Sequence, residues 1–367
     1  MIALLLLSLI TLAFSGTSHA QEKERGFFQS SRALSMGDAY TAYAEGFEGP
    51  FYNPAGLALK QELEIKPFDV EVLGSQDFAL FGKGALTNLT NLSNLMQEIS
   101  QNGGKNYSVG LSIVPQMLVK NFSIGVVARG FAEGKVLDNG NLDLYSFADL
   151  GAYAQTGLSF GGGIFKIGGG IKIIDRAELI NEYTPAEYVD SNLEFGNEWR
   201  EGLGIGYDVG ALLTFPVRFL PRFAVSFQDL GGTKFEDQQL LFKNNKSADG
   251  PPGTIRQRVN VGFGFKVKHG RNVRSHFMTE LKDVSNAFKS DPYLSAADYI
   301  HAGWELNVRD ILYLRAGANQ GRYWTGGFGL HVGGMGLELA SFGENVAFKG
   351  NPRVDDRKFV LRYFLKF

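Results

Sequence analysis

The sequence predicts an all-β protein: an antiparallel, up-and-down transmembrane β-barrel of about fourteen strands with an N-terminal hatch segment in its lumen. Three observations predict this fold. The chain starts with an apolar segment typical of export, and most of the remainder alternates apolar and polar residues with a period of two. The connections between the alternating segments are, in turn, short and long.

The composition excludes several functional classes. The 367 residues include 47 glycines and 13% aromatic residues, and 20% are charged, somewhat below the roughly one quarter of an average globular protein. The formal net charge of -2 provides no basic field for nucleic acid. Because there is no cysteine, disulfides, thiolate metal sites and cysteine nucleophiles are excluded.

Residues 1–20 have the pattern of a signal peptide. Residues 2–14 are almost continuously apolar, which is too short for a bilayer span of about 20 residues. Ser18-His19-Ala20 before Gln21 is a small-residue cleavage site. The start lacks the expected Lys or Arg, which a misplaced start codon would explain, and an N-terminal anchor helix is the alternative. We expect export to the outer membrane of a Gram-negative cell.

The alternating segments predict strands with one apolar face. Apolar residues occupy every second position in residues 107–113, 122–129, 165–173, 205–215 and 259–267, and a period of two places them on one side of a strand. About fourteen such strands begin near the following residues: Leu63, Tyr107, Phe122, Leu150, Phe165, Ile205, Phe223, Val259, Val273, Ile300, Ile311, Thr325, Met335 and Phe359.

The lengths of the connections distinguish a membrane barrel from a soluble sandwich. Short connections (115–121, 161–164, 216–222, 268–272, 307–310, 333–334) alternate with long ones (74–106, 131–149, 175–204, 231–258, 282–299, 342–358), and only 319–324 breaks the alternation. An up-and-down outer-membrane barrel has tight periplasmic turns and longer outer loops. In a soluble β-sandwich there is no reason for short and long connections to alternate. The barrel is closed because an unpaired strand edge in lipid costs several kcal/mol per polar group.

The C-terminal strand resembles a barrel-assembly signal. Phe359, Leu361, Tyr363, Leu365 and Phe367 form an apolar face that ends on an aromatic residue. We expect Tyr363, Leu365 and Phe367 to be recognised by the barrel-assembly machinery, and an ordinary closing strand is the alternative.

The segment before the first strand does not alternate. Residues 21–62 are rich in Gly and Ala, and they contain Asn53-Pro54-Ala55-Gly56, where the residue before proline avoids the α region. Because this segment has no place in the wall, we expect it to form a hatch inside or beneath a barrel of residues 63–367.

Two motifs in this segment resemble a known family. Residues 32–39, Arg-Ala-Leu-Ser-Met-Gly-Asp-Ala, followed by Tyr52-Asn-Pro-Ala-Gly-Leu57, are similar to the hatch signature of the FadL superfamily of outer-membrane proteins. Residues 225–231, 301–305 and 314–317 are closer in texture to its PorV-type and TraF-like branches. The resemblance implies a fourteen-stranded barrel closed by the hatch, shaped at Asn53, Pro54, Ala55 and Gly56. Family transporters release hydrophobic molecules sideways through a gap in the wall, whereas other branches serve in secretion.

If the apolar face meets lipid, the other face lines the lumen with charges of both signs, which favours ion pairs to the hatch over an open pore. These residues are Arg129, Gln155, Lys166, Lys172, Asp208, Lys266, His301, Glu305, Arg315, His331, Glu338 and Arg362. Many lumen positions are glycine: 110, 125, 168, 170, 206, 210, 262, 264, 303, 317, 327 and 329. Glycine weakens strands; we expect these glycines to ease barrel curvature, with room for a plug or ligand as the alternative.

The first long outer connection contains a candidate hydrophobic ligand site. Its apolar residues recur at spacings of three and four, which forms one face of an amphipathic helix; they are Leu86, Leu89, Leu92, Leu95, Met96 and Ile99. Packing of this helix on the barrel rim is the alternative.

The sequence does not predict an enzyme. Residues 157–161 match G-x-S-x-G, but Ser159 lies in an alternating strand rather than in the strand-turn-helix elbow that this motif requires. The histidines His269, His276, His301 and His331 have no metal or triad spacing. We therefore expect no enzymatic activity, no cofactor and no metal.

Two functions follow from these patterns. The first is an outer-membrane barrel that binds or transports hydrophobic, fatty-acid-like molecules and contacts outer-membrane lipid. The alternative is a non-transporting interaction protein accessory to secretion or envelope assembly, with a protein partner at the long outer loops, among them the acidic connection of residues 175–201.

Overall fold

The computed structural model describes residues 26–59, 62–80, 104–137, 139–184, 186–187, 199–238, 250–287, 295–346 and 353–367. The predicted signal peptide (residues 1–20) and the predicted outer-loop ligand site (residues 86–99) lie outside the described residues. Both therefore stay predictions.

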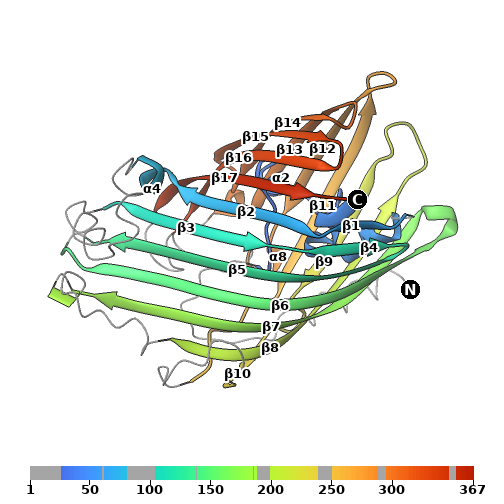
Figure 1. Ribbon diagram of the computed structural model, residues 1–367. Helices are drawn as coiled ribbons and strands as arrows, with labels where there is room; N and C mark the ends of the chain where they lie inside the picture. The colour runs from blue at the N-terminus through green and yellow to red at the C-terminus, as the bar shows by residue number, and fades with distance from the viewer. Residues whose placement is uncertain are drawn as a thin grey trace.

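Fourteen antiparallel strands form the wall (Figure 1). They are β2 (Phe68–Ser75), β3 (Asn106–Ile113), β5 (Phe122–Val136), β6 (Leu142–Phe160), β7 (Phe165–Tyr183), β8 (Arg200–Thr214), β9 (Arg222–Gln228), β11 (Arg258–Lys268), β12 (Val273–Leu281), β13 (Ile300–Val308), β14 (Leu312–Asn319), β15 (Tyr323–Val332), β16 (Met335–Asn345) and β17 (Asp355–Leu365). Each strand pairs with its two neighbours, and the last strand, β17, pairs with the first, β2. The predicted closed barrel is confirmed.

Three short strands extend the wall at its ends. β4 (Gln116–Val119) continues β3 past Pro115, and β1 (Glu64–Lys66) pairs with β4. β10 (Phe235–Glu236) pairs with β8. The barrel also closes at its C-terminus, where the N–H of Phe367 donates to the carbonyl of Ile65 at 2.8 Å and the N–H of Ile65 donates back at 2.9 Å.

Burial in the wall is the inverse of burial in a soluble protein. Along β17, Leu361 is 48% exposed, whereas its neighbour Arg362 is 1% exposed. The same holds around the barrel, where outward Ile124, Ile171 and Leu337 are exposed. Such a surface is stable against acyl chains and not against water, so this face of the wall spans a membrane.

Outer and inner connections differ in length, with two exceptions. The two ends of the barrel chain lie on one side, which is the periplasmic side of such a barrel. On this side, short turns connect β4 to β5, β6 to β7 and β15 to β16. Most connections on the other side are longer. The predicted long connection 131–149 is wrong, because β5 and β6 continue the ladder until only residues 137–141 separate them. The connection 320–322 is also short, as its sequence indicates.

Several strands start earlier than predicted. β6 begins at Leu142 instead of near Leu150, β8 at Arg200 instead of near Ile205, and β17 at Asp355 instead of near Phe359. Because β7 also continues to Tyr183, the connection predicted at 175–204 is reduced to residues 184–199. All these additional residues lie at the outer ends, where the strand surface has left the lipid and apolar alternation is no longer required.

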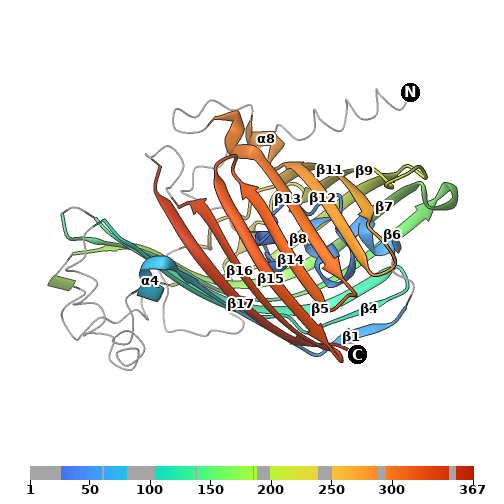
Figure 2. The same cartoon turned by 90° about the horizontal axis from the view of Figure 1, so that it is seen from above.

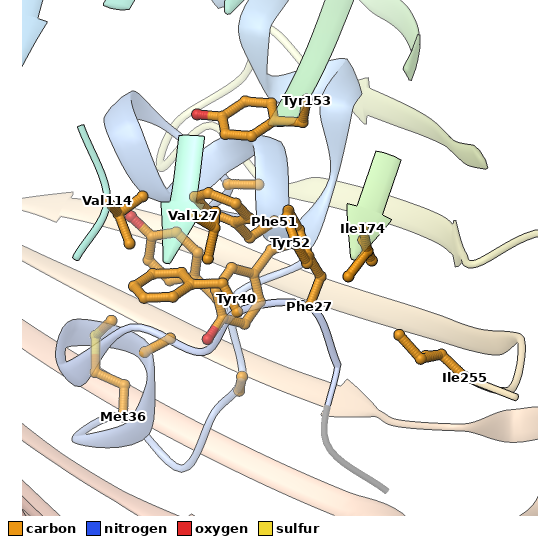
Figure 3. Close-up of a cluster of buried hydrophobic side chains, with 14 of the residues drawn as sticks. Phe27, Met36, Tyr40, Phe51, Tyr52, Val114, Val127, Tyr153, Ile174 and Ile255 are labelled. Carbon is orange, nitrogen blue, oxygen red and sulfur yellow. The ribbon is translucent and has the colours of Figure 1, made fainter. Parts of the chain in front are cut away.

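The N-terminal segment fills the lumen (Figure 2). It consists of α2 (Ser31–Leu34), η1 (Gly46–Glu48), α3 (Gly49–Tyr52) and η2 (Pro54–Leu59), joined by turns. Its aromatic residues Phe27, Tyr40, Phe51 and Tyr52 pack into a buried cluster (Figure 3), which wall residues complete from β5, β6, β7 and β12. The segment described here, residues 26–59, is called the hatch below.

α4 (Gln76–Leu80), α8 (Val284–Ala287) and η5 (Ala296–Tyr299) lie in the outer connections, and η3 (Gly161–Gly163) forms the turn between β6 and β7. Among the residues that the structure describes, no helix is sufficiently long and apolar to cross a membrane.

Candidate functional site

Asn53 ties the hatch to the wall. Its side chain is fully buried and donates from Nδ2 to the carbonyls of Thr41 and of Ala211 in β8, both at 3.2 Å. Oδ1 accepts from the backbone N–H of Ala55 at 3.0 Å. Because Pro54 follows, Asn53 has an extended backbone. One side chain thus links two hatch turns to one strand.

Pro54 and Ala55 lie directly against glycines of the wall. A Cβ on Gly168 of β7 would be 2.3 Å from the backbone of Pro54 and Ala55, and a Cβ on Gly210 of β8 would be 1.9 Å from Oδ1 of Asn53. Gly56 meets the hatch itself, since its Cβ would lie 1.6 Å from the Ala44 carbonyl. Only glycine permits this approach of two backbones.

Residues 35–37 of the hatch also lie directly against glycines, on the opposite side of the wall. Cβ atoms on Gly303 and Gly317 would lie 2.4 Å and 2.5 Å from the backbone of Met36 and Gly37, and a Cβ on Gly327 would lie 2.4 Å from the Ser35 side chain. The prediction that lumen glycines chiefly ease curvature is wrong at these positions. These glycines leave room for the hatch, as the alternative interpretation of the sequence states.

Arg32 of the hatch is held by wall carboxylates. Its guanidinium donates to both oxygens of Glu305 in β13, at 2.9 Å and 2.7 Å. Glu305 is fully buried and also accepts from Nε of Arg315 at 2.8 Å. Arg315 in turn donates to Glu338 of β16 at 3.0 Å, and Glu338 accepts from the Ser31 hydroxyl at 2.9 Å.

Glu48 of the hatch continues this network on the periplasmic side. It accepts from Arg362 of β17 at 2.9 Å and lies 3.8 Å from the Nζ of Lys66. Arg362 also donates to both oxygens of Asp69 at 2.7 Å. Burial raises the pKa of Glu48, but the charges of Lys66 and Arg362 outweigh burial and hold the pKa below its usual value.

Asp38 connects the outer end of the hatch to the wall. It forms an ion pair with Lys282, just beyond β12, and accepts from Tyr52 Oη at 2.9 Å and from Gln29 Nε2 at 3.1 Å. Burial raises the pKa of Asp38, but the neighbouring ammonium of Lys282 outweighs this and lowers it. The backbone at Asp38 has a φ of 59°, in the left-handed region.

These contacts define the ion-paired side of the hatch, which faces β12 to β17 and β2. Taking both charges out of water is costly, and the loss of one partner from a buried pair costs about 3–5 kcal/mol because the other charge stays uncompensated. The network therefore fixes this side of the hatch, since displacing it separates several pairs at once.

A different surface, the cavity side, faces β2 to β6. Phe131, Tyr145 and Phe147 form an aromatic cluster with Leu73 beside it. Between this cluster and the hatch lies a cavity of about 50 Å³. Its lining residues are Phe28, Gln29, Leu34, Glu71, Leu73, Gly110, Ser112, Arg129, Gly130, Phe131 and Phe147. Arg129 lies 4.7 Å above the Phe147 ring and donates to the Gly26 carbonyl at 2.5 Å.

The lumen residues predicted from the sequence face inward. Gln155, Lys166, Lys172, Asp208, His301, Glu305, Arg315, Glu338 and Arg362 are buried, and Arg129, Lys266 and His331 are partly buried. The sequence did not single out Asp38, Glu48, Phe28 or Phe147. The first three lie in a segment without periodicity, and Phe147 falls in the connection wrongly predicted to be a loop.

The other predicted site residues lie apart from this interface. Tyr363 and Leu365 belong to β17, and Phe367 follows it with 80% exposure; their assembly role stays a prediction. Ser159 is an exposed residue of strand β6, not of an elbow. Within the described ranges, no group of three or more His, Asp or Glu side chains could hold a metal ion.

Among known proteins, solved structures with a similar fold exist, although their sequences differ from this chain. No protein-family model matches the chain, and no curated protein matches it. Among solved structures, it is similar to the toluene transporter TodX of P. putida, with a TM-score of 0.52, 12% identity, and coverage of 94% of this chain and 99% of TodX. A TodX deltaS2S3 mutant, described as a monoaromatic hydrocarbon channel, has a TM-score of 0.54 at 10% identity and covers 95% and 100%. At these identities the likeness shows the fold alone.

Proposed function

We propose that this protein is an outer-membrane barrel that passes hydrophobic small molecules, with the hatch as its gate. The supporting observation is the cavity side of the hatch, where Phe28, Phe131 and Phe147 line a space inside the barrel. Aromatic and aliphatic surface with a few polar groups is typical of sites for apolar ligands. The barrel shares its fold with a toluene transporter, which makes monoaromatic hydrocarbons as well as fatty acids candidate cargo.

Passage requires the hatch to move. The cavity of about 50 Å³ is a third of an engineered 150 Å³ cavity that binds benzene. The ion-paired side resists movement, whereas the cavity side is held by fewer polar contacts, such as Arg129 to Gly26. We therefore place the route between the hatch and strands β2 to β6.

We place the route inside the lumen and not through the wall. The resemblance implied a sideways gap, but β5 pairs with β6 from Phe122 to Val136 and with β3 along Asn106–Ile113. Opening the wall there would leave several backbone groups unpaired in lipid, at several kcal/mol each.

The test compares two neighbouring substitutions on β3. Ser112 lines the cavity, whereas Leu111 faces lipid and is 48% exposed. Ser112→Phe should fill the cavity and lower uptake of radiolabelled toluene and oleate about tenfold, while Leu111→Phe, the same new side chain on the opposite face, should leave uptake unchanged. Heat-modifiable migration on gels confirms that both variants fold.

Three results would contradict the proposal: no uptake by wild type above cells without the barrel, equal uptake by wild type and a folded Ser112→Phe variant, or equal loss in both variants. Uptake of toluene but not oleate, or the reverse, would support the route and identify its cargo.

The predicted outer-loop ligand site adds a separate test. A Leu89→Glu/Leu92→Glu double variant places charges on the apolar face expected for residues 86–99. If that face captures ligand, uptake at low substrate concentration should fall and uptake at saturation should not. Unchanged uptake at low substrate concentration would indicate that these leucines pack on the barrel rim.

A second candidate function is a non-transporting interaction protein, as in the secretion-associated branch of the family that the sequence resembles. The observation in its favour is the ion-paired side, which fixes the hatch through Arg32, Asp38 and Glu48. Affinity capture from cross-linked outer membranes should then recover a stoichiometric partner, and recovery of the barrel alone would weaken this candidate.

A further inference from the structure

The lipid-facing wall of β15, β16, β17 and β2 carries an apolar groove. Its volume is about 520 Å³, within the roughly 300–1,000 Å³ of small-molecule sites. β15, β16, β17 and β2 lie side by side in this order (Figure 1). The groove is thus part of the membrane-facing surface, whereas the hatch contacts the opposite face of the same strands.

The groove results from one row of small residues. Gly326, Ser341, Phe359 and Gly74 are opposite one another across the four strands, and three of these four have little or no side chain. The next outward row towards the periplasm is large and apolar; it consists of Phe328, Leu339, Leu361 and Val72. A depression bordered by large apolar side chains has the shape and chemistry to hold an acyl chain.

A cation lies at the outer edge of this groove. Arg357 of β17 faces outward, two residues beyond Phe359, and pairs with Gly343. Its Nη1 donates to the carbonyl of Trp324 at 3.0 Å and to the hydroxyl of Ser341 at 3.2 Å. Trp324 is 78% exposed, as expected for an aromatic side chain at the membrane-water interface.

Within the part of the chain that the structure describes, the hydrogen bonds of the Arg357 side chain leave its charge without a counter-ion. Both acceptors, the Trp324 carbonyl and the Ser341 hydroxyl, are neutral. The adjacent Asp356 faces the lumen, where it contacts Lys358. The nearest acid on the outward face of the strand, Asp355, already accepts from Arg353 and Tyr323. A guanidinium has five N–H donors and binds phosphate with paired hydrogen bonds. At the edge of an apolar belt, an uncompensated guanidinium attracts an anionic headgroup.

A second groove provides an internal comparison. It has about 450 Å³ and lies on the outward face between β11 and β15, lined by aromatic and small residues such as Trp304, Ala302 and Ala316. Its lining includes no charged residue. The lining of the first groove also includes no charged residue. Arg357 lies between the two grooves, since it donates to Ser341 of the first groove and to the carbonyl of Trp324, which lines the second. The first groove differs in that Arg357 contacts a side chain of its small-residue row.

We propose that this wall binds an outer-leaflet lipid of the phosphorylated lipid A class, with its phosphate on Arg357 and one acyl chain in the groove of Gly326, Ser341 and Gly74. Three observations identify this occupant: the positive charge of Arg357, its position at the outer edge of the membrane-facing surface, and the apolar groove next to it. The groove and the hatch cavity share no lining residue, and the variants below change outward-facing residues, so this site can be tested separately from the passage of hydrophobic molecules.

The test measures lipid A that remains on the barrel after purification from outer membranes in mild detergent. Native mass spectrometry counts phosphorylated lipid adducts per barrel. Arg357→Gln keeps hydrogen-bonding capacity without charge and should lower occupancy about tenfold, whereas Arg357→Lys should retain much of it. Ser341→Leu fills the groove with a side chain that lipid tolerates, and should lower occupancy by a similar factor.

The control is Arg322→Gln, which removes an exposed arginine of the neighbouring outer turn. Its occupancy should equal that of wild type. Delipidated barrel is then titrated with vesicles containing lipid A or phosphatidylglycerol, which separates the two sources of a lipid phosphate. Preferential retention of lipid A that depends on both Arg357 and Ser341 supports the site.

Three outcomes would overturn the site: equal occupancy in wild type and Arg357→Gln, an equal loss in Arg322→Gln, or retention of phosphatidylglycerol at the level of lipid A. Heat-modifiable migration checks that each barrel is folded before its lipid is counted.

Discussion

The two sides of the hatch are held by different forces. On the ion-paired side, Arg32 and Glu48 join a network that runs through Glu305, Arg315 and Arg362. On the cavity side, aromatic rings face the hatch across a space of about 50 Å³. Buried ion pairs thus fix one side. The other side is covered by apolar contacts and by a few hydrogen bonds, such as those from Arg129 to Gly26 and from Ser31 to Glu71.

This difference indicates where a gate can open. Apolar contacts can slide, because their free energy depends on buried area rather than on geometry. Buried ion pairs cannot, because a partly separated pair loses its Coulombic gain and stays desolvated. A hatch that pivots about the ion-paired side would widen the cavity next to β3 and β5.

The largest effect is expected at the centre of the ion-paired side. Glu305→Ala removes the carboxylate that Arg32 and Arg315 share and leaves Arg315 with Glu338 alone. This should lower the free energy of unfolding by about 3–5 kcal/mol. Urea titration in lipid vesicles measures this value, and single-channel recording should show more frequent opening. Glu236→Ala, at an exposed position, is the control and should change stability by less than about 0.5 kcal/mol. Equal midpoints for both variants would remove the distinction between the two sides.

The backbone approach at the hatch motif should give the next effect. Gly168→Ala introduces a Cβ at 2.3 Å from the Pro54 and Ala55 backbone, and overpacking of this kind costs about 1–3 kcal/mol. Gly169→Ala on the same strand is the matched control, because its Cβ would meet only a carbonyl at 3.5 Å. Limited proteolysis should cleave the hatch faster in Gly168→Ala only. Equal cleavage would mean that the hatch does not require this contact.

Acid should loosen the hatch at its carboxylates. The pKa values of Asp38 and Glu48 lie below their usual range, so these groups stabilise the docked hatch above the unfolded pKa of about 4. That contribution is lost as the pH falls through the lowered folded values. Conductance should stay low from about pH 7 to pH 5 and rise below about pH 4. A Glu48→Gln variant should lose part of this dependence, and a rise that begins near neutral pH would contradict the assignment.

The smallest effect is expected on the cavity side. Ser112→Val adds apolar volume next to free space, so its free energy of unfolding should change by less than about 1 kcal/mol. Thr325→Val, on the other side, removes a hydroxyl that accepts from Gly37 N–H at 2.9 Å and donates to Ser35 at 3.0 Å, and should cost about 1–3 kcal/mol. A larger cost for Ser112→Val would mean that both sides are packed alike.

The barrel wall was predictable because lipid imposes one rule on every strand. Leu361 and Arg362 alternate in sequence and face lipid and lumen in the structure. The number, order and direction of the strands follow from that rule. The prediction was wrong where the rule does not apply, as at Phe147, whose segment extends beyond the membrane and was taken for a loop.

The hatch was predictable only as a segment without a place in the wall. Asn53 and Pro54 marked a turn, and mixed lumen charges indicated ion pairs. That Arg32 pairs with Glu305, 273 positions away, could not be deduced, because the pairing depends on how the barrel closes. The role of Gly168 and Gly303 was misjudged for the same reason: a missing side chain does not reveal which backbone occupies its space.

By itself, the sequence determined the two faces of each strand, because period-two alternation acts locally, and the alternating lengths of the connections determined the membrane-spanning barrel. Only the tertiary structure decided where the hatch lies, which charges pair, and where the cavity and the lipid-facing groove form. These features require residues from distant strands to meet. Closure of the ring brings them together, and no local pattern encodes their distances.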